Sequence, residues 1–465
     1  MPSSNNHKSS PWRVVSLIVI AIAIVAAISF LPLEKWSNGN ISDFNLLSDI
    51  VKSADSDVST DINAVETDID SQAAESQQEL VSSQVSQSDS ASVSECAAVK
   101  PNKENGLVII EDYTTSGNGL EHLRNSIRSG KLSRIAVLGD SYIEGDILTQ
   151  DLREQLQDVY GGAGVGYVNM HSEFPGFRRS LRQGGNGWKE YSVSGKANTS
   201  YLGISGHYHK PTGKAVSTYK GVTALGHLKS WNKSQFLFIS PENTTVTTKV
   251  NGGEAVQHSV TGSPEVQAII INGPTESFEV STSGGSLIGL GVWLNDTTGV
   301  SVDCMSSRGY SGTRLSELDG NLVSGMSRYI NYDLIILEFG VNVMSAKQTN
   351  YESFTKRMVK AVDRLRECYP NADILMMGIG DRGEKRGSEV HSMKAAVHMV
   401  DAQRKAAREA RCLFWDTREA MGGDDAIVEW TRKGYTNKDY IHLSHKGGKA
   451  LSTPLFNAIK HNLDK

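Results

Sequence analysis

The chain has 465 residues, of which 38% are hydrophobic, and its net charge is −5. This length allows two or three domains, and the acidic balance excludes the basic surface expected of a nucleic-acid-binding protein. The four cysteines are too few and too scattered for a disulfide scaffold, and no Cys-x-x-Cys or His-x-x-x-His spacing occurs. We therefore expect no metal ion and no cofactor.

An uncharged apolar run follows a few basic residues at the N-terminus. It covers residues 14–31, close to the length that crosses a bilayer. The positive-inside rule predicts a cytoplasmic segment at 1–13, a transmembrane signal anchor at 14–32 and an extracytoplasmic, periplasmic body. The alternative is a cleaved signal peptide and a secreted protein, because Ala27–Ser29 has the small-x-small pattern of a cleavage site.

Residues 33–105 form a polar tract rich in Ser, Asp, Gln and Glu, without a sustained apolar face. Such a segment cannot bury enough surface to offset the entropy lost on ordering. It is therefore predicted to be a disordered acidic linker. A weakly helical stalk is the alternative, because Ile62, Val65 and Ile69 have helical spacing.

The next informative feature is a predicted strand–turn–helix unit. The apolar run at 134–138 predicts a buried strand, and the apolar spacing over 147–159 predicts a helix. Gly139, Asp140 and Ser141 lie between them. Hydrolases present a nucleophilic serine on a turn of this kind, with a helix N-terminus behind it to stabilise developing negative charge. The alternative is that these residues only cap the helix, which is the supporting role that we expect for Asp140.

The residues from 173 to 302 have a different pattern. Short alternating runs separated by turn residues predict an inserted β-sandwich or jelly roll, and no helical pattern interrupts them. These runs lie at 235–239, 244–250, 266–271, 277–280 and 287–293. Strands and helices then alternate, as in a doubly wound α/β sheet, at 332–338, 354–365, 373–378, 391–411 and 412–416. One discontinuous α/β domain is therefore predicted from 106–172 and 303–465.

Near the C-terminus, Asp439 and His442 lie three residues apart in one predicted loop. Both can face one pocket, where His442 would take the proton of Ser141 and Asp439 would fix the imidazole tautomer. The alternatives are a surface loop that caps the last helix, or His445 as the base.

An acyl-transfer site also needs donors for an oxyanion. Gly312 follows a predicted strand at 300–305, and glycine there lets a backbone N–H approach a ligand. Gly340 and Asn342 follow the strand at 332–338, and the Asn amide is a suitable donor. The alternative for both segments is an ordinary turn.

Together these segments resemble the SGNH, or GDSL-type, hydrolases. The four blocks of that family match, in order, Gly139-Asp140-Ser141, Gly312, Gly340-x-Asn342 and Asp439-x-x-His442. The longer strings at 139–156, 161–166 and 414–423 are similar to periplasmic peptidoglycan O-acetylesterases, which carry a carbohydrate-binding-like β-module inserted after the first block.

The resemblance implies a flavodoxin-like, three-layer domain with a parallel sheet and helices on both faces. It also implies Ser141 as nucleophile, His442 as base and Asp439 as its partner. The oxyanion hole would consist of the Ser141 N–H, the Gly312 N–H and the Asn342 side chain, supported by Asp140 and Gly340.

The implied activity is that of a serine esterase that removes O-acetyl groups from an extracytoplasmic glycan, with peptidoglycan as the first candidate, through an acyl-enzyme. The expected partners are this O-acetylated glycan and, through the N-terminal helix, a membrane. The alternatives are an O-acetyltransferase with the same triad and a non-catalytic glycan-binding protein. The intact set of site residues argues against the last of these.

Overall fold

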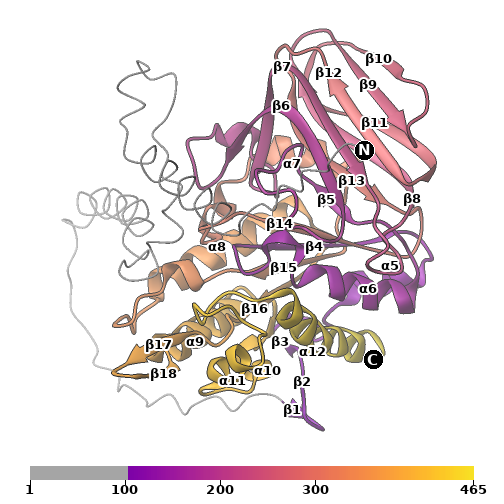
Figure 1. Cartoon of the computed structure of the whole chain (residues 1–465). Helices are drawn as coiled ribbons and strands as arrows, with labels where there is room; N and C mark the ends of the chain where they lie inside the picture. The colour runs from indigo at the N-terminus through magenta and orange to yellow at the C-terminus, as the bar shows by residue number, and fades with distance from the viewer. Residues whose placement is uncertain (1–102) are drawn as a thin grey trace, which may run out of the picture. The chain divides into compact units, whose positions relative to one another are not determined.

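The computed structural model describes residues 103–465 (Figure 1). The predicted cytoplasmic segment at 1–13 and the anchor at 14–32 lie outside the described residues, as does nearly all of the predicted linker at 33–105. The last residues of that linker, Lys103–Glu104, form strand β1, which pairs with β2 (Leu107–Val108). Within 103–465, no helix is long and apolar enough to cross a membrane.

A six-stranded sheet forms the centre of the α/β part, in the order β14-β4-β15-β16-β19-β3. The strands are β4 (Ser133–Gly139), β14 (Val300–Ser306), β15 (Leu334–Glu338), β16 (Asp373–Met377), β19 (Leu413–Trp415) and β3 (Glu111–Asp112). The first five in the sheet are parallel. Numbered along the chain they run 2-1-3-4-5, which is the flavodoxin-like order.

The expectation of a wholly parallel sheet is wrong at one edge. Strand β3 pairs antiparallel with β19, so the sheet is mixed. A crossover helix imposes a parallel direction on the neighbouring strands that it joins. Helix α5 (Glu121–Arg128) connects β3 to β4, but β3 lies at the edge beside β19 rather than beside β4, so this connection does not set its direction.

Two apolar cores cover the two faces of this sheet, because successive strand residues point to opposite sides. On β4, for example, Ala136 and Leu138 enter one core, and Ile135 and Val137 enter the other. The first face packs against α7 (Gly320–Ser327), α8 (Glu352–Cys368) and α9 (Lys394–Glu409). The second face packs against α5 (Glu121–Arg128), α6 (Thr149–Tyr160), α10 (Thr417–Met421), α11 (Ala426–Arg432) and α12 (His445–Leu463). The three-layer prediction is therefore correct.

Nine further strands lie in the chain between β4 and β14 and hydrogen-bond to one another (Figure 1). They are β5 (Gly166–Val168), β6 (Arg182–Ser192), β7 (His207–Lys220), β8 (Trp231–Ser240), β9 (Thr244–Val250), β10 (Val256–Val260), β11 (Ser263–Thr275), β12 (Ser277–Thr282) and β13 (Ile288–Asn295). All pairings are antiparallel, and β7 and β13 each pair with three neighbours. The sequence predicts two packed sheets, whereas these shared strands join all nine into one branched sheet.

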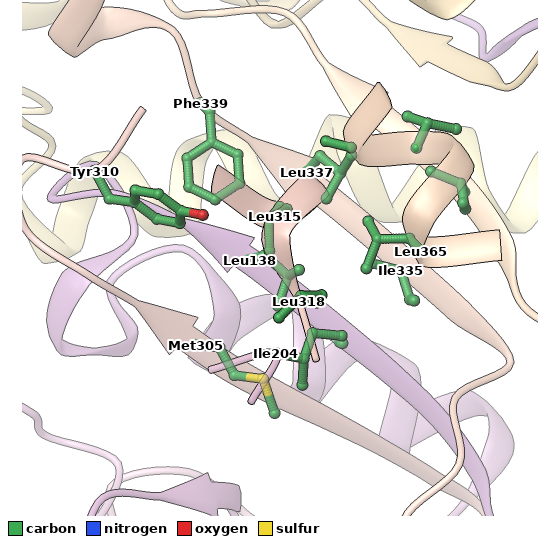
Figure 2. Packing of buried hydrophobic residues seen from close by; sticks show 14 of the residues in the cluster. Leu138, Ile204, Met305, Tyr310, Leu315, Leu318, Ile335, Leu337, Phe339 and Leu365 are labelled. Carbon is green, nitrogen blue, oxygen red and sulfur yellow. The ribbon is translucent and has the colours of Figure 1, made fainter. Parts of the chain in front are cut away.

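This β-module, which we define as residues 166–295, shares a core with the α/β part. On β8, Phe236 and Phe238 enter a core of the module itself, whereas Leu237 and Ile239 enter the core that contains Leu138 of β4. Figure 2 shows part of this shared core. The alternation of β8 therefore attaches the module to the α/β part through apolar contact on one face.

A buried carboxylate reinforces this attachment. Asp303 of β14 is fully buried, and its Oδ2 accepts hydrogen bonds from Trp293 Nε1 of the module and from the Tyr332 hydroxyl, both at 2.8 Å. Its Oδ1 accepts one from the Tyr167 N–H at 3.2 Å. Because a buried polar group requires partners, these bonds fix the module at the start of β14.

A small hairpin of β17 (Gly383–Arg386) and β18 (Glu389–Ser392) precedes α9. The sequence predicts a helix from residue 391, but the structure begins α9 at Lys394. The first two residues of the predicted helix instead pair within the hairpin, which periodicity alone does not reveal.

Candidate active site

The serine of the first motif lies just beyond the carboxyl end of β4, at the edge of the sheet where ligands bind in this fold. The chain turns at Ser141 and passes through a short 3₁₀ helix, Glu144–Asp146, before α6 begins at Thr149. The predicted α-helix N-terminus therefore does not lie directly behind the serine. Asp140 does not cap α6 as expected; its Oδ1 accepts from the Tyr142 N–H at 2.8 Å and fixes the turn.

Three residues from the two ends of the α/β part form a continuous hydrogen-bonded chain. The Ser141 hydroxyl lies 2.9 Å from His442 Nε2, and His442 Nδ1 lies 2.8 Å from Asp439 Oδ2. The carboxylate holds the proton on Nδ1, which leaves Nε2 as an acceptor for the hydroxyl. The structure therefore brings the predicted nucleophile, base and acid into contact.

The electrostatics of this chain favour a charged imidazole. The hydrogen bond with Asp439 raises the pKa of His442; burial opposes the shift, and the charges of Asp439 and Asp140 add to it. Burial acts to raise the pKa of Asp439, but hydrogen bonds from the His442 side chain and from two backbone N–H groups lower it overall. Asp439 therefore stays ionised and can stabilise the imidazolium that forms when Ser141 gives up its proton.

The loop that carries the acid and base is held from both sides. Tyr440, between them, has φ of 59°, which is uncommon for a residue with a side chain. The Tyr440 carbonyl accepts from the Gly383 N–H at 2.9 Å, and the His442 carbonyl accepts from the Asn437 N–H at 2.8 Å. These backbone bonds position the imidazole without using its ring.

Two of the predicted oxyanion donors are backbone N–H groups, those of Ser141 and Gly312. Among the described residues, neither the Ser141 N–H nor the Gly312 N–H has a hydrogen-bond acceptor. Gly312 has φ of 79°, and an added Cβ would lie 2.4 Å from the Phe339 ring. Both the backbone angle and the packing therefore require glycine here, as the oxyanion-hole prediction assumes.

The third predicted donor, Asn342, is already engaged. Its Nδ2 donates to Asp140 Oδ2 at 2.8 Å and to the Tyr310 carbonyl at 3.2 Å. An amide nitrogen has two hydrogens, so these contacts use both. Asn342 would have to release the carbonyl to serve an oxyanion. Gly340 supports this turn with φ of 134°, where an added Cβ would lie 3.0 Å from Ile379.

A pair of buried carboxyl groups lies behind the nucleophile, and no sequence motif points to its second member. Asp140 and Glu338 are each 1% exposed. Burial raises the pKa of Asp140 to about 7. Burial and the charge of Asp140 raise the pKa of Glu338 well above its usual value. This environment therefore favours the neutral form of Glu338.

Other polar candidates lie apart from this chain of contacts. His445 is the first residue of α12, and its Nδ1 lies 3.4 Å from Gln150 Nε2 rather than beside the serine. One group in the described part of the chain has ligand atoms close enough to hold a metal ion, namely Glu154, Asp158 and His227. It contains no residue of the candidate active site.

Comparison with known proteins confirms the resemblance to the SGNH hydrolases. Residues 275–450 match the GDSL-like Lipase/Acylhydrolase family. The match includes Gly312, Asn342, Asp439 and His442, but it begins after Ser141, because the β-module separates the first block from the others. In the folded chain this first block nevertheless lies at the candidate site, because Ser141 contacts His442.

A solved structure shares the fold. The chain is 22% identical to one titled "Peptidoglycan O-acetylesterase in action, 5 min", with a TM-score of 0.62, over 76% of this chain and 99% of that chain. A family two carbohydrate esterase from Cellvibrio japonicus also matches, at 11% identity and a TM-score of 0.27, over 61% of this chain and 98% of that chain. No curated protein matches. Residues 275–450 are thus similar to the GDSL-like Lipase/Acylhydrolase family, and the chain shares its fold with the first of these structures.

Proposed function

We propose that this protein is a serine esterase that removes O-acetyl groups from an extracytoplasmic glycan, with peptidoglycan as the first substrate to test. The observation that carries the proposal is the unbroken contact from Ser141 through His442 to Asp439. The extracytoplasmic location rests on the sequence of residues 1–32. The choice of peptidoglycan is supported by the longer sequence strings that resemble peptidoglycan O-acetylesterases.

In the proposed reaction, His442 takes the hydroxyl proton as Ser141 attacks the acetyl carbonyl. The N–H groups of Ser141 and Gly312 stabilise the oxyanion. His442 then protonates the departing sugar oxygen, which leaves an acetyl-enzyme. Water, deprotonated by the same imidazole, attacks this ester and releases acetate.

The decisive test is acetate release by the full chain from O-acetylated peptidoglycan, with O-acetylated xylan and O-acetylated alginate in parallel. We expect release from peptidoglycan at the highest kcat/KM. Release from xylan or alginate alone would reassign the glycan. Transfer of acetyl to a glycan hydroxyl without free acetate would favour the acetyltransferase.

The pH dependence offers a separate prediction about the base. Only a neutral His442 can accept the Ser141 proton, so kcat/KM for 4-nitrophenyl acetate should fall as pH decreases through the pKa of His442. That pKa is raised above 6.5, mainly by Asp439. The acidic limb of the pH profile should therefore have its midpoint above pH 6.5. Asp439→Asn should move this limb to lower pH and reduce the plateau on the order of 10⁴-fold.

The matched control for this measurement is Asp464→Asn, which changes an exposed carboxylate at the far end of α12. It should leave both the limb and the plateau in place. An Asp439→Asn variant with the wild-type limb would show that Asp439 does not set the pKa of the base.

A further inference from the structure

A polar cavity lies between the β-module and the turn that carries the serine. Building on the esterase function proposed above, we propose that it binds an uncharged sugar unit of the glycan chain next to the acetylated sugar. The cavity has a volume of about 340 Å³, within the range of small-molecule sites. The module would then contribute directly to substrate binding.

The walls of the cavity place it beside Ser141. On the α/β side it is lined by the 3₁₀ helix Glu144–Asp146 and by Ser306, Ser307 and Arg308, which follow β14. The Ser307 N–H donates to the Gly139 carbonyl at 3.0 Å, two residues before the serine. The charge of Arg308 also acts to lower the pKa of His442. A ligand in this cavity would therefore extend from the reacting ester.

The opposite wall comes from the module, through β6, β7 and the loop between β5 and β6. His207 of β7 joins the two walls, since its Nε2 lies 3.0 Å from the Ser306 carbonyl. Asn169, His171 and Gln183 add hydrogen-bonding side chains. His171 has no hydrogen-bond partner among the described residues and is only partly buried. It is therefore available to a ligand.

The charges of the lining favour a neutral ligand. Glu144 pairs with Arg308 at 2.9 Å, and Asp146 pairs with Arg178 at 3.3 Å. Glu190 likewise pairs with His207. Among the charged side chains of the lining, Glu173 alone lacks an opposite partner, and it is exposed. The unpaired Glu173 is negative, and the partner of Glu190 is a histidine rather than a permanent cation, so the lining disfavours an anionic ligand. Its hydrogen-bonding side chains suit the hydroxyl and amide groups of an uncharged sugar.

Two exposed aromatic rings complete the lining. Phe174 is 61% exposed and Phe177 is 42% exposed, and both line the cavity. The Arg308 guanidinium lies 6.0 Å from the centre of the Phe174 ring. An exposed apolar ring beside polar groups is typical of a ligand site, and the C–H face of a sugar can pack on it. The lining thus offers both kinds of contact that a pyranose ring makes.

The test compares His171→Ala and Phe174→Ala with wild type on O-acetylated peptidoglycan and on 4-nitrophenyl acetate, which has no sugar unit to occupy the cavity. We expect each variant to raise KM for peptidoglycan and to lower the ratio of the two kcat/KM values roughly tenfold. His398→Ala, an exposed histidine on α9, is the matched control and should keep the wild-type ratio. Unchanged ratios in both cavity variants would overturn the proposal.

A binding measurement keeps the inference separate from the esterase function. Full-length Ser141→Ala is titrated with chitotetraose, an uncharged oligomer of N-acetylglucosamine, and with anionic tetragalacturonate. We expect chitotetraose to bind more tightly than tetragalacturonate. In the double variant Ser141→Ala/His171→Ala, the Kd for chitotetraose should rise roughly tenfold. Loss of this preference, or an unchanged Kd, would refute the subsite. If these binding results are obtained but the wild-type protein releases no acetate from peptidoglycan, the proposed substrate is refuted and the subsite is not.

Discussion

Ser141→Ala should lower the turnover of 4-nitrophenyl acetate by the full chain on the order of 10⁶-fold. The reason is the position of the hydroxyl, which lies 2.9 Å from His442 Nε2 in a residue whose own N–H has no acceptor among the described residues. Removing it leaves the base and the oxyanion donors but no atom that can form the acyl-enzyme. Release of 4-nitrophenolate, followed by absorbance, measures the effect.

A pair of histidines provides the control. His442→Ala should be nearly as inactive as Ser141→Ala, because members of a triad act as one unit. His445→Ala should retain activity close to wild type, because His445 lies beside Gln150 rather than beside the serine. An active Ser141→Ala enzyme, or an inactive His445→Ala enzyme with active His442→Ala, would refute the assignment of nucleophile and base.

Arg153→Ala should cause the largest loss of stability, on the order of 3–5 kcal/mol in the free energy of unfolding. Arg153 and Asp146 are fully buried and form two hydrogen bonds, at 2.7 and 2.8 Å. Burial alone would raise the pKa of Asp146, whereas Arg153 and Arg178 together lower it. Without Arg153, much of the compensation for a buried carboxylate is lost. Urea-induced unfolding measures the change.

Arg432→Ala is the matched comparison for that experiment. Arg432 also pairs with a carboxylate, that of Glu429 at 2.7 Å, but its side chain is 73% exposed. Solvent screens such a pair, so the loss should be much smaller than that for Arg153→Ala. Equal losses for the two variants would show that the burial of the Asp146 pair does not determine its contribution.

Most of the α/β part was predictable because its signals are local. The apolar runs at 134–138 and 373–378 are now β4 and β16, and the helical spacing at 354–365 lies within α8. Strand β3 was not predictable in the same way, because two residues carry no periodicity. The long strands β6 and β7 were also missed, since the glycines and charged residues of β6 obscure its alternation.

The candidate site was likewise predictable only where its signals are local. Ser141, Asp439 and His442 belong to short motifs, so their residue types and spacing predicted the chain of contacts that the structure contains. Glu338 and Arg308 gave no such signal, because their importance depends on neighbours distant in sequence. The engagement of Asn342 with Asp140 and with Tyr310 is equally a property of the folded chain.

The β-module also affects when the enzyme can first act during synthesis. A ribosome that has just added Ser141 must add 301 more residues before His442 exists. Any nascent chain that stalls within the module therefore carries a serine that has no base to activate it. The proposed hydrolysis can begin only after the strands that follow the module have been made and have paired with β4.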